Sequence, residues 1–375
     1  MSAGERTEPL PARAQRLTGE LKERELDLLL VTTPVDVRYL TGFTGSSGLA
    51  LMAGSGAAGE PGAHRFFTDF RYRTQSAEQV PGSFEREIVA GDMLEAVASA
   101  LAEGGGRLGY DDAHLTVKAH RRLTELIGES WELVPTAGAV ERLRAIKEPG
   151  EIARMRAATE LADEALRRTL EAGIVGRTER DVAIELELRM RRLGAEEPSF
   201  PSIVASGANG ALPHAEPRDV QIAPDVLVTI DWGAVLEGYC SDCTRTFATG
   251  ERISELARET YDLVLRAQLA GLGAVRAGPA GREVDAVSRE VIERAGQGAN
   301  FGHGLGHGVG LEVHERPRLS QTSGEEELRP GHVVTVEPGV YVPGELGVRI
   351  EDLVVVEADG QDVLTSLPKE LTVVS

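Results

Sequence analysis

The chain has 375 residues, of which 41% are hydrophobic, a length and composition suited to two globular domains with separate cores. Its 60 acidic and 40 basic residues give a formal net charge of −20, which would repel a phosphate backbone, so we expect no nucleic-acid partner. Residues 1–17 contain no apolar leader segment, and no later apolar run approaches the roughly 18 residues of a membrane span, so we expect a cytoplasmic protein without membrane contact.

In the first part of the chain, short apolar runs alternate with helical patterns. This alternation predicts an N-terminal α/β domain over residues 1–145. No G-x-G-x-x-G motif follows a strand there, so a dinucleotide site has no support. The expected strands are Leu26 to Val31, Gly48 to Met52, Arg65 to Thr68, Glu87 to Val89 and Arg107 to Tyr110, and the expected helices are Leu94 to Leu101 and Thr116 to Leu126.

A polar segment containing Pro149 and Gly150 separates this part from a second domain, which we place over residues 146–375. Long amphipathic patterns follow, and one of them has a hydroxyl cap at Thr178 and a glycine end at Gly194. The expected helices run from about Glu151 to Glu171, from Thr178 to Gly194, from Ser254 to Val275 and from Glu283 to Ala295.

The rest of this second domain consists of strand patterns joined by hairpin-length connections, without regular βαβ alternation. This favours an α+β domain with a largely antiparallel sheet. A helix pair followed by a hairpin occurs twice, which indicates an internal duplication. The expected strands are Val226 to Trp232, Tyr239 to Ala248, His332 to Glu337 and Gly347 to Val356.

The only cysteines, Cys240 and Cys243, are too few for a disulfide framework and are consistent with a reducing compartment. Their C-x-x-C spacing also occurs in redox and zinc sites. Within one strand, however, residues three apart point to opposite faces, and no second cysteine pair is available to complete a zinc site. We therefore expect no chemistry at these thiols.

Two carboxylates flank the first predicted hairpin of the second domain. Asp231 ends an otherwise apolar run, where burying its charge without a partner or a metal ion would cost on the order of several kcal/mol. A hairpin centred between Leu236 and Glu237 would place Asp231 opposite Asp242. Because like charges directly opposed in a sheet are destabilising, we expect a cation between them.

The same pattern recurs near the C-terminus, where Glu337 ends a β-branched run. A hairpin centred on Gly344 would turn Glu337 toward Glu351. A single acid of this kind is more often structural or exposed, but two hairpins that each present paired acids indicate a shared ligand role.

Three histidines, His303, His307 and His314, lie in or beside the glycine-rich segment Gly302 to Gly310. The glycines let the backbone approach a site closely, and the histidines offer neutral nitrogen ligands or proton-transfer groups. Four carboxylates and one imidazole suit Mn²⁺, Co²⁺ or a di-zinc site better than a thiolate-type zinc site. Four anionic ligands would overcompensate one divalent cation but match two, held about 3.5–4 Å apart.

These residues resemble the pita-bread metallopeptidases (M24), and within them the proline-specific branch of Xaa-Pro dipeptidases (prolidases) and Xaa-Pro aminopeptidases. The resemblance implies a creatinase/prolidase-type, RNase H-like N-terminal domain, which methionine aminopeptidases usually lack, and a pita-bread catalytic domain with a curved, largely antiparallel sheet. It covers essentially the whole chain and rests on Asp36 to Gly45, Thr68 to Tyr72, Thr229 to Ala234, Gly238 to Phe247, Gly302 to Gly310, Thr335 to Tyr341 and Val348 to Asp352.

The resemblance implies that Asp231, Asp242, His307, Glu337 and Glu351 are the metal ligands, with Asp242 shared and Glu351 bridging. Two ions, expected to be Mn²⁺ with Co²⁺ or Zn²⁺ as alternatives, would bridge a hydroxide that attacks the carbonyl of an Xaa-Pro bond. Glu337 would accept its proton and pass it toward the leaving nitrogen.

The resemblance also implies roles for groups that are not ligands. His214, His303 and His314 match histidines that contact substrate and stabilise the developing oxyanion, and Arg349 matches an arginine near the metal-binding acids. An ordinary strand ion pair is the alternative for Arg349, and Tyr239 fits sheet packing as well as support of a ligand. The family implies a homodimer, in which an N-terminal domain helps to close a neighbouring site.

Two other functions stay open beside the dipeptidase that cleaves small proline-containing peptides. The first is an Xaa-Pro aminopeptidase acting on longer peptides, since no residue identifies a clamp for the substrate's C-terminal carboxylate. The second is a metal-free or non-catalytic relative of the same fold. Such a relative would be expected to lose ligands, and here all five ligand positions carry the expected residue type.

Overall fold

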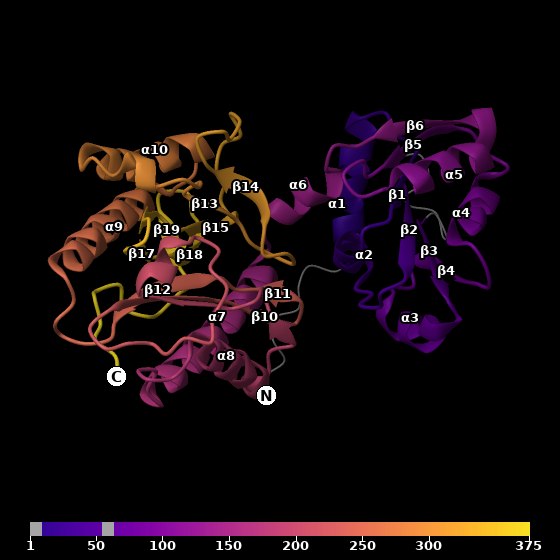
Figure 1. Ribbon diagram of the computed structural model, residues 1–375. Helices are drawn as coiled ribbons and strands as arrows, with labels where there is room; N and C mark the ends of the chain where they lie inside the picture. Colours follow the sequence, from indigo (N-terminus) through magenta and orange to yellow (C-terminus); the bar gives the residue numbers. More distant parts are fainter. Residues whose placement is uncertain (1–9, 55–63) are drawn as a thin grey trace. The chain divides into compact units, whose positions relative to one another are not determined.

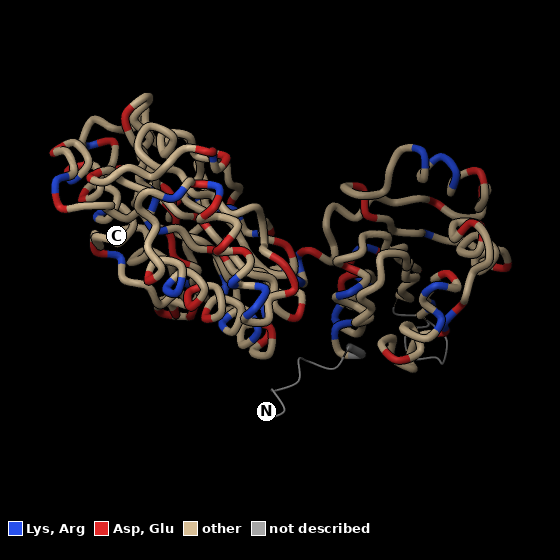
Figure 2. Tube along the Cα trace, turned by 60° about the horizontal axis from the view of Figure 1, so that its bottom comes forward, with Lys and Arg blue, Asp and Glu red and all other residues tan. Residues whose placement is uncertain are grey.

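The computed structural model describes residues 10–54 and 64–375 and divides the chain into two compact units, Met1–Arg144 and Ala145–Ser375 (Figure 1). Residues 1–9, part of the stretch that we searched for a leader segment, lie outside the described residues. Within the described ranges, no helix combines the length and apolar character needed to cross a bilayer. Acidic and basic positions are interspersed along the traces of both units (Figure 2).

The first unit is built on a six-stranded mixed sheet with the order β4-β3-β2-β1-β5-β6. The pairs β1–β5, β5–β6 and β3–β4 are parallel, while β1–β2 and β2–β3 are antiparallel. The strands are β1 (Leu28–Val31), β2 (Gly48–Ala53), β3 (His64–Asp69), β4 (Phe84–Val89), β5 (Gly106–Tyr110) and β6 (Trp131–Pro135). The helices are α1 (Leu10–Glu23), α2 (Pro34–Thr41), α3 (Arg73–Gln79), α4 (Met93–Leu101), α5 (Val117–Ile127) and α6 (Ala139–Ala145), with short 3₁₀ turns η1 (Phe70–Tyr72) and η2 (Gly128–Ser130).

All five expected strands and both expected helices of this unit are present, although several ends differ by a few residues. The core packs apolar side chains of the sheet against α4 and α5, with Phe67, Leu108 and Leu123 completely buried. Strand β6 and the helices α1, α2, α3 and α6 were not expected from the sequence. The α/β class expected for this unit is confirmed.

The second unit contains two helix pairs, and most of its labelled strands lie between them in Figure 1. Every pairing between its named strands is antiparallel, which confirms the expected α+β class. The helices are α7 (Pro149–Glu171), α8 (Glu179–Leu193), α9 (Glu255–Ala274) and α10 (Gly281–Arg294), with η3 (Gly207–Ala211) and η4 (Gly298–Asn300). The first strands are β7 (Glu197–Pro198), β8 (Ile203–Ser206), β9 (Leu227–Trp232), β10 (Ala234–Leu236), β11 (Tyr239–Cys240) and β12 (Cys243–Ala248). The later strands are β13 (Gly306–Gly308), β14 (Glu315–Leu319), β15 (Val333–Val336), β16 (Gly339–Val342), β17 (Leu346–Arg349), β18 (Asp352–Val356) and β19 (Gln361–Val363).

Helix α8 has the ends that its sequence predicts. The Thr178 hydroxyl accepts a hydrogen bond from the Asp181 backbone N–H at 3.0 Å. At the other end, Gly194 takes a left-handed φ of 117°, which costs a glycine little. Both local signals therefore act where the sequence places them.

The first hairpin corrects our expected register. Leu236 pairs with Tyr239 and Asp231 with Thr244, so the turn consists of Glu237 and Gly238. Both have positive φ, 50° and 83°, as a type I′ hairpin turn requires. Asp242 is therefore not opposite Asp231 and lies in a break between β11 and β12. The error of one residue in the turn centre displaces each pairing by two residues, which keeps every side chain on its expected face.

The second hairpin has the expected register. Gly339 pairs with Arg349 and Val342 with Leu346, which centres the turn on Gly344. The neighbouring pair β15–β18 continues the same register, and the two ladders are separated by a break that contains Glu337 and Glu351. The breaks in the two hairpin ladders thus carry Asp242, Glu337 and Glu351, while Asp231 is paired within β9.

The first residues of the second unit are bonded into that unit. Ile146 forms a bridge with His332, and the Lys147 backbone N–H donates to the Gly331 carbonyl at 2.8 Å. The Lys147 ammonium also donates to Glu315 Oε2 at 3.0 Å, with both side chains buried. This short segment is therefore an integral part of the unit in which it begins.

Burial, together with the nearby charges of Lys147 and Arg329, lowers the pKa of His332 to about 4. An unfolded histidine titrates near 6.5, so between these values the unfolded chain binds more protons. The free energy of unfolding should therefore fall as pH drops through this window, by up to about 3 kcal/mol from this residue. A His332→Asn variant, whose amide oxygen can still accept from the Arg329 N–H, is expected to show a flatter dependence in urea unfolding between pH 7 and 4.5. The control is His114→Asn, at an exposed position, which should keep the pH dependence of the wild type. If His332→Asn shows the same pH dependence as this control, the assignment is contradicted.

Candidate metal centre

Three buried or half-buried acids converge from separate strands of the second unit. Asp231 lies on β9, Asp242 in the break between β11 and β12, and Glu351 in the break between β17 and β18. Each offers a carboxylate oxygen, and these oxygens lie within 4.8 Å of one another. The hairpins therefore deliver three potential oxygen ligands to one point.

His307 and Glu337 stand beside this group. His307 Nε2, on β13, lies 3.3 Å from Glu337 Oε1 and 3.7 Å from Asp242 Oδ2. Thr335 fixes both, because its hydroxyl accepts from the His307 backbone N–H and donates to Glu337. His307 Nδ1 lies 3.0 Å from the Gly308 carbonyl, a contact that places a ring proton on Nδ1. Against the effect of burial, Glu337, which Nε2 faces, raises the His307 pKa, and a metal ion bound at Nε2 would take the place of the proton there.

The acids repel one another in a poorly hydrated space. Burial, followed by the carboxylates of Glu351 and Asp231, raises the pKa of Asp242 well above its usual value. Burial and the charges of Glu337 and Asp231 raise the pKa of Glu351 in the same way. Burial also raises the pKa of Asp231, against the opposing effect of Arg349. A bound cation would remove this repulsion and let all three acids ionise.

Glu337 and Asp231 show how the group fits a cation. Burial would raise the pKa of Glu337, but the hydrogen bond and charge of His307 hold it at about 2, so this carboxylate is ionised at neutral pH. Asp231 Oδ2 accepts from Arg349, whereas its buried Oδ1 has no hydrogen-bond partner among residues 10–54 and 64–375. A buried anionic oxygen without a donor is an open ligand position, so the residues fit a divalent cation.

Arg349 is 4% exposed and donates from all three of its nitrogens. Its contacts are Asp231 Oδ2 at 2.7 Å, Tyr341 Oη at 2.8 Å, Thr244 Oγ1 at 3.0 Å and the Pro213 carbonyl at 3.1 Å. This is a richer set of contacts than a single strand ion pair. The guanidinium therefore orients one oxygen of Asp231 and leaves the other free.

Three residues of this network were not among the expected site residues. Thr244 donates to Glu351 Oε2 at 2.6 Å, Tyr341 accepts from Arg349, and Thr335 joins the backbone of one expected ligand to the side chain of another. A signal for Thr244 was available, because it lies two residues after Asp242 and so on the same face of the chain. A buried tyrosine hydroxyl likewise needs a polar partner.

Two of the other expected histidines, His303 and His314, contact residues of this network. His303 Nε2 lies 2.8 Å from Tyr341 Oη, and burial lowers the His303 pKa. The His314 ring meets the His307 ring edge-on with centroids 4.3 Å apart, and burial and His307 lower its pKa. His214 is exposed after η3, and its charge contributes to lowering both of these pKa values. His303 and His314 are therefore neutral near pH 7.

Tyr239 serves the end of a helix. Its hydroxyl donates to Glu151 Oε1 at 2.8 Å, and Glu151 forms a capping box with Glu148 in the first turn of α7. The contact ties the strand before Asp242 to that helix. We considered sheet packing and support of a ligand for Tyr239. The hydrogen bond to Glu151 shows that the residue also anchors α7 to the strand.

The two cysteines are free and buried, 4% and 2% exposed. Burial raises the pKa of Cys240 to about 12 and that of Cys243 well above its usual range. Because the thiolate is the reactive form, both should react with a disulfide reagent at pH 8 at least about 100-fold more slowly in the native protein than in guanidinium. Time courses of thiol release test this, and rapid labelling of two thiols per native chain would contradict it.

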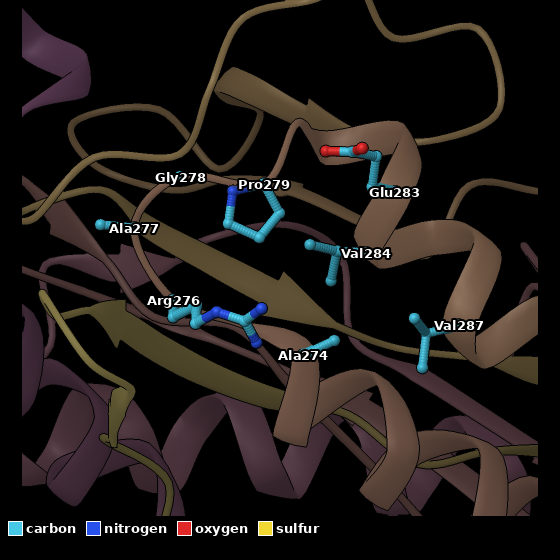
Figure 3. A pocket seen from close by; sticks show the side chains of 8 residues that line it. All are labelled: Ala274, Arg276, Ala277, Gly278, Pro279, Glu283, Val284 and Val287. Carbon is cyan, nitrogen blue, oxygen red and sulfur yellow. The ribbon is translucent and has the colours of Figure 1, made fainter.

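Two other features of the described residues include none of these acids. In the first unit, Asp111, His114 and Glu141 also come within 4.8 Å, but the Asp111 oxygens already accept from Thr33 and the Ala113 N–H. A surface hollow of about 520 Å³ lies between the end of α9 and the start of α10 (Figure 3). It is lined by Ala274, Arg276, Ala277, Gly278, Pro279, Glu283, Val284 and Val287, and by none of the expected ligands.

Comparison with known families agrees with this architecture. Residues 153–358 match metallopeptidase family M24, and residues 13–146 match the creatinase/prolidase N-terminal domain. The chain therefore belongs to metallopeptidase family M24 and is a metallopeptidase with a creatinase-type N-terminal domain and a pita-bread catalytic domain. This confirms the family and the two-domain fold expected from the sequence.

Individual relatives are similar over nearly their whole length. An uncharacterized peptidase of Bacillus subtilis, YqhT, is 44% identical over 93% of this chain and 96% of its own. The solved Xaa-Pro dipeptidase from Bacillus anthracis is 40% identical with a TM-score of 0.91, covering 97% of this chain and 100% of that one. An X-Pro aminopeptidase structure from Thermotoga maritima is 33% identical with a TM-score of 0.86, covering 96% and 99%.

Proposed function

We propose that this metallopeptidase hydrolyses the Xaa-Pro bond of small peptides with two divalent ions held by Asp231, Asp242, His307, Glu337 and Glu351. The observation that carries the proposal is the set of three carboxylates within 4.8 Å, one with a buried oxygen that has no donor among the described residues. Four acids beside one histidine supply enough negative charge for two divalent ions.

Two divalent ions held by these residues would supply an activated water as the nucleophile and would polarise the scissile carbonyl. The ionised Glu337 carboxylate takes the proton of the nucleophile and returns it to the leaving nitrogen. Neutral His314 can donate an N–H to the carbonyl oxygen without adding charge. The single N–H of neutral His303 donates from Nδ1 to the Gly304 carbonyl, so this residue can contact the peptide through its ring. Exposed His214 can contact the peptide from the solvent side. Arg349 keeps Asp231 oriented.

We propose a dipeptidase in preference to an aminopeptidase. Its support is the similarity to the Bacillus anthracis dipeptidase, at 40% identity, over the Thermotoga maritima aminopeptidase, at 33%. We also propose Mn²⁺ as the native ion, because the ligand set is rich in oxygen. We propose a cytoplasmic location, because both thiols are free. We propose a homodimer by analogy with the family.

The test is proline release from Leu-Pro and leucine release from Leu-Pro-Ala by chelated protein, before and after Mn²⁺ is added. Metal-dependent cleavage of Leu-Pro alone supports the dipeptidase. Leucine release from the tripeptide supports the aminopeptidase instead. Lack of cleavage of both peptides, with metal bound as measured by elemental analysis, would refute proline-peptide hydrolysis.

A further inference from the structure

Helix α10 carries a buried ion pair outside every motif discussed above. Asp285 is 0% exposed and Arg289, one turn later, is 7% exposed. Arg289 Nε donates to Asp285 Oδ2 at 2.8 Å, and Nη2 donates to Oδ1 at 2.9 Å. Burying two charges costs much of what their attraction gains, so such a pair is a poor device for stability alone and calls for another explanation.

The pair holds the loop that precedes His307. Arg289 Nη1 donates to the Phe301 carbonyl at 3.0 Å, and Nη2 donates to the His303 carbonyl at 2.7 Å. Asp285 Oδ1 accepts from the Leu305 backbone N–H at 2.9 Å. The guanidinium also lies 4.1 Å from the centre of the Phe301 ring. Three main-chain groups within residues 301–305 are thus fixed by two side chains of one helix.

The fixed loop bears the His303 ring. Its Nδ1 lies 2.8 Å from the Gly304 carbonyl and its Nε2 lies 2.8 Å from Tyr341 Oη, which in turn accepts from Arg349. Gly302 and Gly304 flank His303 and allow the backbone wide freedom, so the loop cannot hold this ring by its own stiffness. The helix supplies the rigidity that the glycines lack.

We propose that Asp285 and Arg289 are positioning residues that set the orientation of His303 for contact with substrate. This inference rests on the proposed function of His303. The role needs the guanidinium fork, because one group must reach two carbonyls and one carboxylate at fixed angles. A lysine keeps the charge that neutralises Asp285 but cannot make these contacts together.

The experiment compares Arg289→Lys, His303→Ala and the double variant with Arg294→Lys as the matched control. Arg294 pairs with Glu290 on the same helix and with the same spacing, but both side chains are exposed. Arg289→Lys is expected to lower kcat/KM for Leu-Pro by about 10- to 100-fold, since a displaced catalytic contact costs on that order. In the His303→Ala background, Arg289→Lys should lower kcat/KM by less than about 3-fold. If Arg289 acts through His303, the two substitutions remove the same contact and their effects are not additive.

Additive losses, or an Arg289→Lys enzyme within about 2-fold of the wild type, would overturn the proposal. Amide hydrogen exchange gives a readout that needs no activity. Faster exchange confined to residues 301–305 in Arg289→Lys, and absent in Arg294→Lys, supports the positioning pair, and unchanged exchange refutes it. If the metal-loaded wild type cleaves neither peptide, the proposed function fails, and the exchange result still decides whether the pair holds the loop.

Discussion

Replacing Asp242 with alanine is expected to lower metal-dependent kcat/KM by about 10⁴-fold or more, as removal of a central catalytic group does. A carboxylate oxygen of Asp242 lies within 4.8 Å of oxygens of both Asp231 and Glu351, and its Oδ2 lies 3.7 Å from His307 Nε2, so Asp242 is next to three of the other proposed ligands. Adding Mn²⁺ to chelator-treated wild type should raise its melting temperature, because a ligand that binds the folded state stabilises it. This rise should be absent in Asp242→Ala.

Without metal, the same substitution should not lower the stability of the protein. Without ions, Asp242 is one of several buried acids that repel one another, so Asp242→Ala should be at least as stable as the chelated wild type. The exposed Asp219→Ala, which loses a surface pair with Arg180, is the control and should keep both activity and the thermal response to metal. A normal Mn²⁺-induced thermal shift in Asp242→Ala would remove Asp242 from the ligand set.

Replacing Asp352 with asparagine is expected to destabilise the metal-free protein by about 3–5 kcal/mol, the usual cost of leaving a buried charge uncompensated. Asp352 is 0% exposed and accepts from Arg245, Gln268, Thr365 and Lys369. Arg245 itself is 1% exposed, so its charge would be left in the core. For a unit of this size, we expect the melting temperature to fall by roughly 6–20 °C.

The matched control is Asp362→Asn, because Asp362 pairs with Arg156 at half-exposed positions of the same unit. Its cost should stay within about 1 kcal/mol. Calorimetry of both variants at pH 7 makes the comparison. Equal, small losses for the two would mean that the amide satisfies the buried donors as well as the carboxylate does.

The register of the two hairpins shows how far the sequence can be interpreted. Around Gly344, the Pro-Gly turn signal has one natural centre, and the structure has it there. Around Gly238, the expected turn centre lies between Leu236 and Glu237 and would place Asp231 opposite Asp242. In the structure the turn residues are instead Glu237 and Gly238, which both have positive φ angles. Because a two-residue displacement preserves the face of a strand, Asp231 and Asp242 still bring their carboxylate oxygens within 4.8 Å of each other.

Other elements lacked a readable signal. Helix α2 begins with Pro34, which suits the first turn of a helix but also marks a break, and it is only eight residues long. The Asp285–Arg289 pair looks like an ordinary exposed i,i+4 pair until the Leu305 N–H and the carbonyls of the glycine-rich loop are seen against it. Side-chain to main-chain contacts between distant segments leave no periodic trace in a sequence.

The segment Ile146–Lys147 determines where a fragment containing only the second unit should begin. Its backbone adds a bridge to His332, and its ammonium neutralises buried Glu315 next to His314. A truncation that starts at the helix of Pro149 would therefore strip out a counter-charge and an edge pairing that belong to the catalytic half. Anyone expressing that half by itself should begin no later than Ala145, and a shorter fragment that misfolds would say nothing about whether the half can fold independently.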